Sequence, residues 1–344
     1  MGWKFIPYTF SNSNNPGGYF DLRPVMSYGT KNIGVIGARR IGKTFQAKYY
    51  VVGHTQYADD KKFVWLRDND EARKKLAMNN GAKFFSDLKK KGITNGSIDG
   101  ETIKVAGKPV GYLMPSSTFQ NYKGNDFEEI KYIVFDEFIP EKSVRHNANR
   151  AWEIINSIYT IASNRKDVRI IFLANALDRG DPLLEFFGLK IKEFGIYVNR
   201  EKDIAFHYCD NSPEFNKARD TSVMGKLIKG TQYEANLFNN QFADDEQMFF
   251  DKRPEKCKLL CILHNYSSSI RLYLKDGVLY VCRDFNVTTN PTIRYVNDLE
   301  LVDTRHQLIP KTYLDAIKQA FVTKRVYFEN AFCKTTFIDI VKNR

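Results

Sequence analysis

The sequence predicts an α/β fold in which a mostly parallel sheet carries a phosphate-binding loop. Residues 32–46 combine an apolar run, a loop of the form GxxxxGK(S/T) and a helix-compatible run. A second apolar run, residues 131–138, contains two adjacent carboxylates near its end. Strand-like and helix-like runs alternate from residue 60 to 175, which is the pattern of parallel strands joined by helices.

Each fixed residue of the loop has a physical task. Its glycines allow a turn with φ > 0, so that backbone N–H groups close on phosphate oxygens. The following helix adds free N–H groups and a partial positive charge. Lys43 is expected to reach the β- and γ-phosphates, and the Thr44 hydroxyl to bind Mg²⁺. A chance match is the alternative, but the strand and helix context agrees with the motif. The predicted nucleotide-binding residues are Gly37, Ala38, Arg39, Arg40, Ile41, Gly42, Lys43, Thr44 and Phe45.

Length, composition and charge limit the remaining possibilities. The 344 residues suggest two domains, and 43% apolar with 14% aromatic residues are enough for substantial cores. A net charge of +12 favours a polyanionic partner or a basic interface, although charge alone is weak support. The five cysteines show no paired zinc spacing, which favours reduced thiols in a cytosolic protein. The sequence shows no signal peptide or membrane-spanning run, so we expect a protein that works in solution inside a cell.

The segments around the loop are predicted as follows. Residues 1–20 are polar and rich in turn-forming residues, as in an arm. Phe20 and Tyr28 are candidates for stacking on a base, although covering a sheet edge is an equal alternative. A strand is expected over 61–67, a helix over 69–78, and small inserted hairpins over 93–114. Surface cations here either face solvent or contact a DNA backbone: Arg73, Lys74, Lys90 and Lys91.

The carboxylates that follow the second apolar run complete the predicted site. In a parallel sheet the carboxyl ends of the strands lie beside the phosphate loop. Asp136 would then hold Mg²⁺ through water, and Glu137 would orient and deprotonate the attacking water. A solvent-exposed strand end is the alternative, but the loop about 90 residues upstream favours catalysis. A glutamate at this position favours hydrolysis over phosphate transfer to a small molecule.

A helix and a further strand extend this site. The helix, residues 148–161, is expected to pack on the sheet through Trp152, Ile155, Ile158 and Tyr159. The strand, residues 168–175, ends at Asn175, which either contacts the γ-phosphate or the attacking water, or caps the loop. Between them lies a basic corner, whose Arg165 is either a surface residue or an arginine finger for a neighbouring subunit. We expect this corner near the phosphate side of the sheet, with Arg150 and Arg145 as further candidates.

The chain changes character after about residue 200. Residues 200–245 are polar and amphipathic, as expected of a lid or linker. Three strand-like runs follow, with Asp276-Gly277 as a hairpin turn between the last two. A helix, a short strand and a closing helix complete residues 313–342. The predicted division is an ATPase domain over 1–200, a linker or lid subdomain over 201–245 and an α+β domain over 246–344.

The order and spacing of these segments resemble one protein family. The chain is similar to the DNA-packaging ATPases, or encapsidation proteins, of phi29-like bacteriophages, which are relatives of large terminase subunits. The phosphate loop or the acidic strand alone would indicate only a P-loop NTPase, whereas the later segments narrow the resemblance to this family. The matching segments are residues 35–44, 133–139, 164–165, 168–169, 174–176, 225–233 and 240–242.

The resemblance implies an additional-strand (ASCE-type) P-loop NTPase core, a small linker subdomain and an RNase H-like C-terminal domain. It implies ATP and Mg²⁺ as cofactors and ATP-driven translocation of double-stranded DNA into a preformed procapsid. The implied assembly is a homopentameric ring on the portal vertex, in some members bound through a scaffold RNA. Such a protein acts in the host cytoplasm, transiently on the procapsid, and is absent from the mature virion.

This chain departs from the family pattern at one position, and another residue gains a role only through the resemblance. The family carries Arg-Asn-Arg where this chain has Ser163-Asn164-Arg165, so Arg165 or Arg150 would have to supply the finger. Lys123 matches a family lysine that acts between subunits.

The C-terminal domain raises a separate question of DNA cleavage. Its first strand lacks the aspartate of nuclease-active terminases, which predicts a vestigial nuclease that docks or binds nucleic acid. The alternatives are a terminase-like enzyme that also cuts DNA and a nucleotide-gated assembly factor. Glu137 argues against the latter, because a pure switch has little need of a catalytic base.

Overall fold

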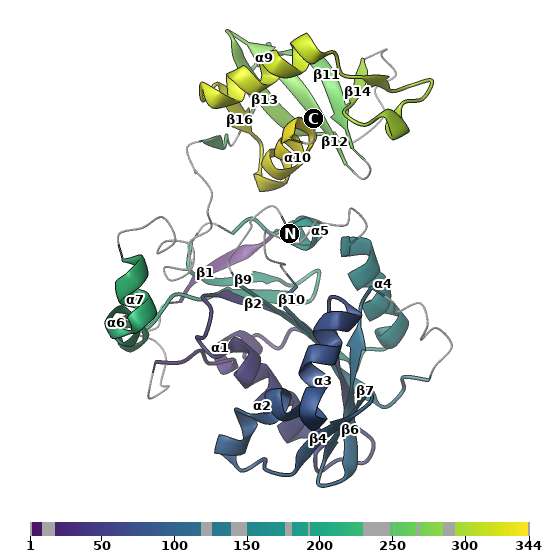
Figure 1. The fold of residues 1–344 in the computed structure, drawn as a ribbon, viewed down its shortest axis with the longest axis vertical. Helices are drawn as coiled ribbons and strands as arrows, with labels where there is room; N and C mark the ends of the chain where they lie inside the picture. The colour runs from purple at the N-terminus through teal and green to yellow at the C-terminus, as the bar shows by residue number, and fades with distance from the viewer. Residues whose placement is uncertain are drawn as a thin grey trace. The chain divides into compact units, whose positions relative to one another are not determined.

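The computed structural model describes residues 2–8, 18–117, 126–138, 150–175, 181–191, 193–229, 248–250, 252–265, 268–284 and 293–342. The chain divides into two compact units (Figure 1). The first unit holds the elements from β1 to α7 except α5 (Pro182–Phe187). The second holds α5 and the elements from β11 to α10. None of the helices in these described ranges is long and apolar enough to span a membrane.

A large sheet forms the centre of the first unit. Its strands run parallel to one another from β10 to β6, and the strands at both margins are antiparallel, so the predicted mostly parallel sheet is confirmed. One strand, β8, lies between β2, which precedes the phosphate loop, and β7, which carries the carboxylates. The spatial order is β1 (Lys4–Pro7), β9 (Gly195–Asn199), β10 (Ile204–Tyr208), β2 (Asn32–Gly37), β8 (Arg169–Asn175), β7 (Ile130–Asp136), β3 (Lys62–Arg67), β6 (Lys108–Pro115), β5 (Thr102–Val105) and β4 (Gly96–Asp99).

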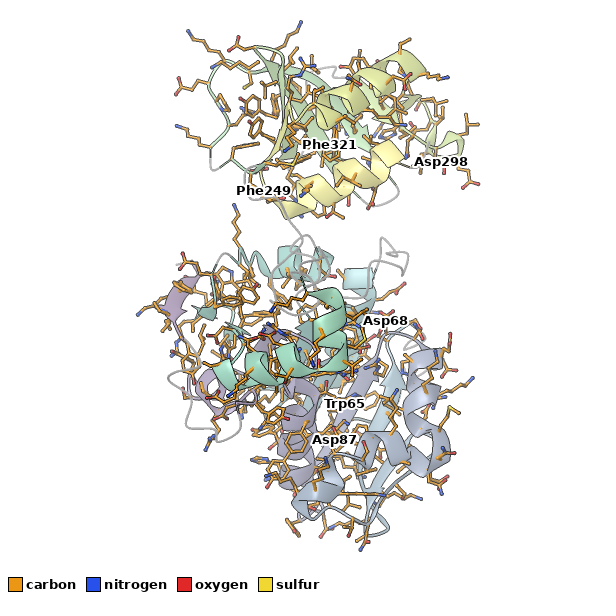
Figure 2. The ribbon with its side chains drawn as sticks, turned by 60° about the vertical axis from the view of Figure 1, so that its left-hand side comes forward. Trp65, Asp68, Asp87, Phe249, Asp298 and Phe321 are labelled. Carbon is orange, nitrogen blue, oxygen red and sulfur yellow. The ribbon has the colours of Figure 1, made fainter. Side chains whose placement is uncertain are left out.

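Helices cover this sheet because its central strands are apolar on both sides. Alternate residues of β2 and β3, such as Val35 and Trp65, share one core with α1 (Arg23–Met26), α2 (Lys43–Thr55) and α3 (Asp70–Phe85). Trp65 is completely buried and lies within this unit in Figure 2. The 3₁₀ helix η2 (Leu88–Lys91) follows α3, and α4 (Arg150–Ala162) packs on β7. The short helices α6 (Pro213–Thr221) and α7 (Val223–Ile228) contact each other.

The structure corrects the predicted edges of this unit. Residues 4–7 lie in the predicted arm, yet they form β1 and pair with β9. The sheet continues past residue 200, since β10 pairs in parallel with β2. A Cβ atom on Gly34 would come within 1.9 Å of the Phe206 ring, so the bare glycine lets these strands pack. The polar turn before β10 conceals this buried strand in the sequence. The small hairpins expected over 93–114 are confirmed, since β4 pairs with β5 and β5 with β6 in antiparallel fashion. In addition, β6 pairs in parallel with β3 and joins these hairpins to the large sheet.

The helix faces also differ in part from the expectation. On α4 the side chains of Trp152 and Tyr159 are exposed, and the buried stripe consists of Ile154, Ile158 and Ile161. The i, i+4, i+7 spacing of these isoleucines defines the apolar face of the helix. The prediction placed that face on the wrong side because it counted the large aromatic side chains as buried. Helix α3 begins at its Asn69 cap as expected but continues past Met78 through a kink to Phe85.

The second unit contains a mixed sheet with two long helices. Strands β11, β12 and β13 form an antiparallel meander, and β14, β15 and β16 pair in parallel with their neighbours. The predicted hairpin is confirmed, since Asp276 and Gly277 both have positive φ between β12 and β13. Helices α9 (Lys311–Val322) and α10 (Ala331–Lys342) share a core with the sheet that includes Phe328 and Phe337. Figure 2 marks Phe249, Phe321 and Asp298 in this unit. The spatial order is β15 (Gln307–Leu308), β14 (Arg294–Val296), β11 (Lys258–His264), β12 (Ser269–Lys275), β13 (Val278–Arg283) and β16 (Val326–Phe328).

Candidate nucleotide site

The phosphate loop joins the carboxyl end of β2 to the first turn of α2. Arg40 and Gly42 have φ of 66° and 101°, so both lie in the left-handed region, and Gly42 is the N-cap of α2. A glycine adopts this conformation without a steric cost, which explains the second fixed glycine of the motif. The backbone N–H of Phe20 donates to the carbonyl of Ile41 at 2.8 Å and ties the upstream segment to the loop.

A cavity of about 440 Å³ opens between this loop and the carboxyl ends of β7 and β8. It brings together six of the nine predicted loop residues, both predicted carboxylates and Asn175, whereas Gly37, Ala38 and Ile41 do not line it. Asp87, which Figure 2 labels, adds a carboxylate from the segment between α3 and η2 that we did not predict. The lining residues are Arg39, Arg40, Gly42, Lys43, Thr44, Phe45, Asp87, Asp136, Glu137, Leu173, Ala174 and Asn175.

The lysine of the loop is buried and fully engaged. Lys43 Nζ donates to the carbonyl oxygens of Gly37 and Ala38, at 2.8 and 2.6 Å, and to Asn175 Oδ1 at 3.1 Å. Burial lowers the pKa of Lys43 to about 8. A phosphate oxygen that binds this ammonium group must therefore compete with the carbonyl oxygens of the loop. Asn175 contacts the lysine directly, as a residue placed to sense the γ-phosphate would.

The two predicted magnesium-binding residues lie together. Thr44 Oγ1 donates to Asp136 Oδ1 at 3.2 Å. Burial raises the pKa of Asp136, while the Arg67 guanidinium lowers it. A hydroxyl and a carboxylate oxygen fit Mg²⁺, which takes few protein ligands and completes its shell with water and phosphate oxygens. Within the described ranges no group of three or more His, Cys, Asp or Glu side chains is placed to hold a metal alone.

Glu137 projects from a strained position at the end of β7. Its φ of 62° lies in the left-handed region, which costs a non-glycine residue about 1–2 kcal/mol. Its side chain is 58% exposed, and Oε2 accepts a hydrogen bond of 2.5 Å from Arg67 Nη2. Strain of this kind is concentrated at active sites and agrees with the predicted role in positioning water.

Arg67, which contacts both predicted carboxylates, is a site residue that the sequence reasoning missed. It ends β3, and its Nη1 donates to Asp136 Oδ2 at 2.9 Å while Nη2 donates to Glu137. Its side chain is only 13% exposed. One guanidinium therefore neutralises both carboxylates and fixes their separation. A polar residue after an apolar strand run was the available signal, since Asp136 and Asn175 end their strands in the same way.

Arg165 does not lie near the phosphate side of the sheet. The corner between α4 and β8 is at the amino end of β8, whereas Asn175 marks its carboxyl end. The prediction of this placement was wrong because a helix that connects parallel strands returns the chain to the opposite edge. The guanidinium instead donates to the carbonyl oxygens of Ala162, Ile161 and Glu128, at 3.4, 2.9 and 2.7 Å.

The other candidate residues have different environments. Arg73 and Lys74 form ion pairs with Asp70 on their own helix, at 2.6 and 2.7 Å, while Lys90 and Lys91 are exposed on η2. Phe20 is buried in the core and cannot stack on a base, and Tyr28 packs at the core margin. Lys123 and Arg145 lie outside the described residues, as does the side chain of Arg150.

Comparisons with known proteins agree on one family. The family model described as Podovirus DNA encapsidation protein (Gp16) matches residues 17–343. The DNA packaging protein of Bacillus phage phi29 is 27% identical over 326 residues, which are 91% of this chain and 93% of that protein. The DNA packaging protein of Bacillus phage B103 is 26% identical over 314 residues, covering 90% and 95%.

Two solved structures share the fold over nearly the whole chain. The bacteriophage Phi-29 viral genome packaging motor assembly contains a chain with a TM-score of 0.69 and 24% identity, covering 94% of this chain and 98% of that one. The Phi-28 gp11 DNA packaging motor gives a TM-score of 0.64 and 17% identity, with coverage of 95% and 98%.

Proposed function

The chain belongs to the podovirus DNA encapsidation protein (Gp16) family, and we propose that it is an ATPase that drives double-stranded viral DNA into a preformed procapsid. The observation that carries the proposal is the meeting of Lys43, Thr44, Asp136 and Glu137 around one cavity. Phosphate-loop, magnesium-binding and water-activating groups are the parts that nucleotide hydrolysis requires.

Each residue has a role in this reaction. Lys43 and the loop N–H groups bind the β- and γ-phosphates, and Thr44 and Asp136 hold Mg²⁺. When bound, the metal neutralises charge that develops on the phosphate oxygens. Glu137 takes the proton of the attacking water, and Arg67 holds both carboxylates in position. Asn175 links the presence of the γ-phosphate to the loop lysine.

The assembly that uses this site is a ring of subunits, by family resemblance a homopentamer on the portal vertex of the procapsid. Docking through a scaffold RNA is part of the same proposal. The protein would act in the host cytoplasm, on the procapsid only during packaging, and be absent from the mature virion. Its net charge of +12 supports DNA contacts that are mostly to phosphates, since a motor must grip any sequence. Lys123 and an arginine remain candidates for completing the site across a subunit boundary.

We propose that the C-terminal unit is a nuclease-shaped module without cleavage activity. The order β13–β12–β11–β14–β15, with three antiparallel strands followed by parallel ones, supports the RNase H-like fold implied by the resemblance. In the described part of this unit, no three His, Cys, Asp or Glu side chains gather where they could hold a metal. By the resemblance, we assign this unit, residues 246–344, to docking or nucleic-acid binding. In the same scheme the ATPase domain continues through β10, and the linker subdomain includes α6 and α7.

ATPase turnover tests the proposed function. The rate is measured for the protein alone, with double-stranded DNA, and with procapsids and DNA together. We expect slow hydrolysis by the protein alone, a rise that exceeds proportionality to protein concentration, and a further rise on procapsids. Magnesium-dependent nucleotide binding without turnover under any of these conditions would contradict the motor and favour the nucleotide-gated assembly factor.

A further inference from the structure

A second cavity, of about 720 Å³, follows the outer side of α2 away from the phosphate loop. Its floor is formed by α2 from Phe45 to the residues after the end of the helix, including Tyr49 and Tyr57. One wall comes from the segment that begins at Asp21, and the other from η2 at Lys91. Phe45 also lines the phosphate cavity, so this groove begins where the phosphate site ends.

We propose that the end of this groove nearest the phosphate loop binds the purine base of the nucleotide, with Phe45 and Tyr49 as its stacking surface. The proposal rests on the proposed function, because the loop must hold the phosphates for the base to reach the groove. This surface takes the base-stacking role that we expected of Phe20, whose ring is buried in the core.

The aromatic surface has the geometry that a base requires. The rings of Phe45 and Tyr49 are nearly parallel, with an interplanar angle of 15° and centroids 6.0 Å apart. They lie one helical turn apart on the same face of α2, and Tyr49 is 44% exposed. Because the two rings stack, a planar ligand can extend the stack on the exposed Tyr49 ring, and the larger area of a purine stacks better than that of a pyrimidine.

The facing wall supplies a fixed polar group. The hydrogen bond from Phe20 N–H to the Ile41 carbonyl holds the segment that contains Asp21 against the phosphate loop. The Asp21 carboxylate accepts from the backbone N–H and the guanidinium of Arg23, at 2.7–3.0 Å. Burial alone would raise its pKa, but these hydrogen bonds hold the pKa below its usual value. The ion pair with Arg23 fixes the Asp21 carboxylate, whose side chain is only 10% exposed, as a polar part of the groove lining.

The far end of the groove provides a matched control. Tyr57 lines the same groove and is 87% exposed, but it follows the end of α2, two helical turns beyond Tyr49 in the chain. A base that is bound next to Phe45 would not reach it. Both tyrosines are exposed enough that truncation to alanine removes little packing.

Equilibrium binding of Mg-ATP, Mg-CTP and Mg-tripolyphosphate, measured by calorimetry, tests the proposal. Tyr49→Ala should weaken ATP binding about tenfold, as expected for the loss of one base-stacking contact, and leave tripolyphosphate binding unchanged. Wild-type protein should prefer ATP over CTP, and Tyr49→Ala should reduce this preference. Tyr49→Phe should bind ATP like the wild type, and so should Tyr57→Ala.

Other outcomes separate the groove from the phosphate site. If Tyr49→Ala binds ATP like the wild type, or loses ATP and tripolyphosphate binding equally, the base does not lie on this surface. If Tyr57→Ala weakens ATP binding as much as Tyr49→Ala does, the assignment to the near end is wrong. If wild-type protein binds neither ATP nor tripolyphosphate, the phosphate site and the proposed function fail together.

Discussion

The large sheet has a carboxyl edge, where its parallel strands end, and an amino edge, where they begin. The two edges carry similar charged residues but use them differently. At the carboxyl edge, Arg67, Asp136 and Glu137 bond to one another beside the phosphate cavity. At the amino edge, Lys62 pairs with Glu129 at 2.6 Å, and Arg165 donates to backbone carbonyls. The direction of a strand therefore decides which of its charged ends can take part in catalysis, because in parallel sheets ligands bind outside the carboxyl ends.

The strongest test of this difference changes one glutamate at each end of β7. Glu137→Gln should lower ATP turnover by about 10²–10⁴-fold with ATP binding retained, because the amide keeps the shape but cannot accept a proton. Glu129→Gln, just before the other end of the strand, should leave turnover unchanged. Steady-state hydrolysis and nucleotide binding are measured for both. Wild-type turnover by Glu137→Gln would remove this residue from the base role.

A second pair of substitutions tests the ends of β3. Arg67→Met should lower turnover at neutral pH by about ten- to a hundredfold, since it removes the group that orients the carboxylates. The guanidinium lowers the pKa of Asp136, so its loss should raise that pKa further. The carboxylate then becomes protonated at higher pH, and the acid limb of the pH–rate profile should move to higher pH.

Lys62→Met provides the control at the start of the same strand and should leave the pH profile in place. A loss of turnover in Arg67→Met with an unmoved acid limb would show that Arg67 acts by another route than charge.

A substitution at the amino edge should change the stability of the protein and not its ATP turnover. Arg165→Ala removes three hydrogen bonds to carbonyl oxygens and should lower the free energy of unfolding by about 1–3 kcal/mol, with turnover of the folded protein unchanged. Urea unfolding and ATPase rates are compared with those of Lys166→Ala, an exposed neighbour. An intact stability with lost turnover, rescued by mixing with Glu137→Gln subunits, would restore Arg165 as a finger in trans.

The sequence predicted the parts of this site that local patterns encode. The loop, the acidic end of β7 and Asn175 each follow an apolar run, and the parallel-sheet rule brings such ends together. Arg67 was missed because its partners lie about 70 residues away and no motif spans that separation. The place of β10 beside β2 was missed for the same reason, since strand order is a property of tertiary packing. The position of Arg165 could have been predicted, because a residue just before a strand lies at the amino end of that strand. The prediction placed it at the carboxyl end instead.

The smallest expected effect concerns the sheet of the C-terminal unit, whose described residues gather no cluster of three His, Cys, Asp or Glu side chains for a metal. Asp284 follows β13 but is buried between Arg271 and Arg294, at 2.7 and 3.7 Å, so its charge is already neutralised. Two-metal cleavage of DNA requires several carboxylates around the ions, and the described residues gather no such group. Supercoiled DNA incubated with the protein and Mg²⁺ or Mn²⁺ should therefore show no nicking above a Lys43→Ala control.

Nicking that depends on the metal and is lost in Asp284→Asn, with ATP turnover intact, would locate an active nuclease in this unit. That result would favour the terminase-like alternative, in which one chain both translocates and cuts DNA. The same nicking in the wild type, Lys43→Ala and Asp284→Asn would indicate a contaminating nuclease, since none of these changes would then affect the cleaving group. Absence of nicking with normal hydrolysis would leave Asp284 as a structural ion-pair partner. The difference between catalytic and structural strand ends would then hold between the two sheets of the chain as well as between the two edges of the large sheet.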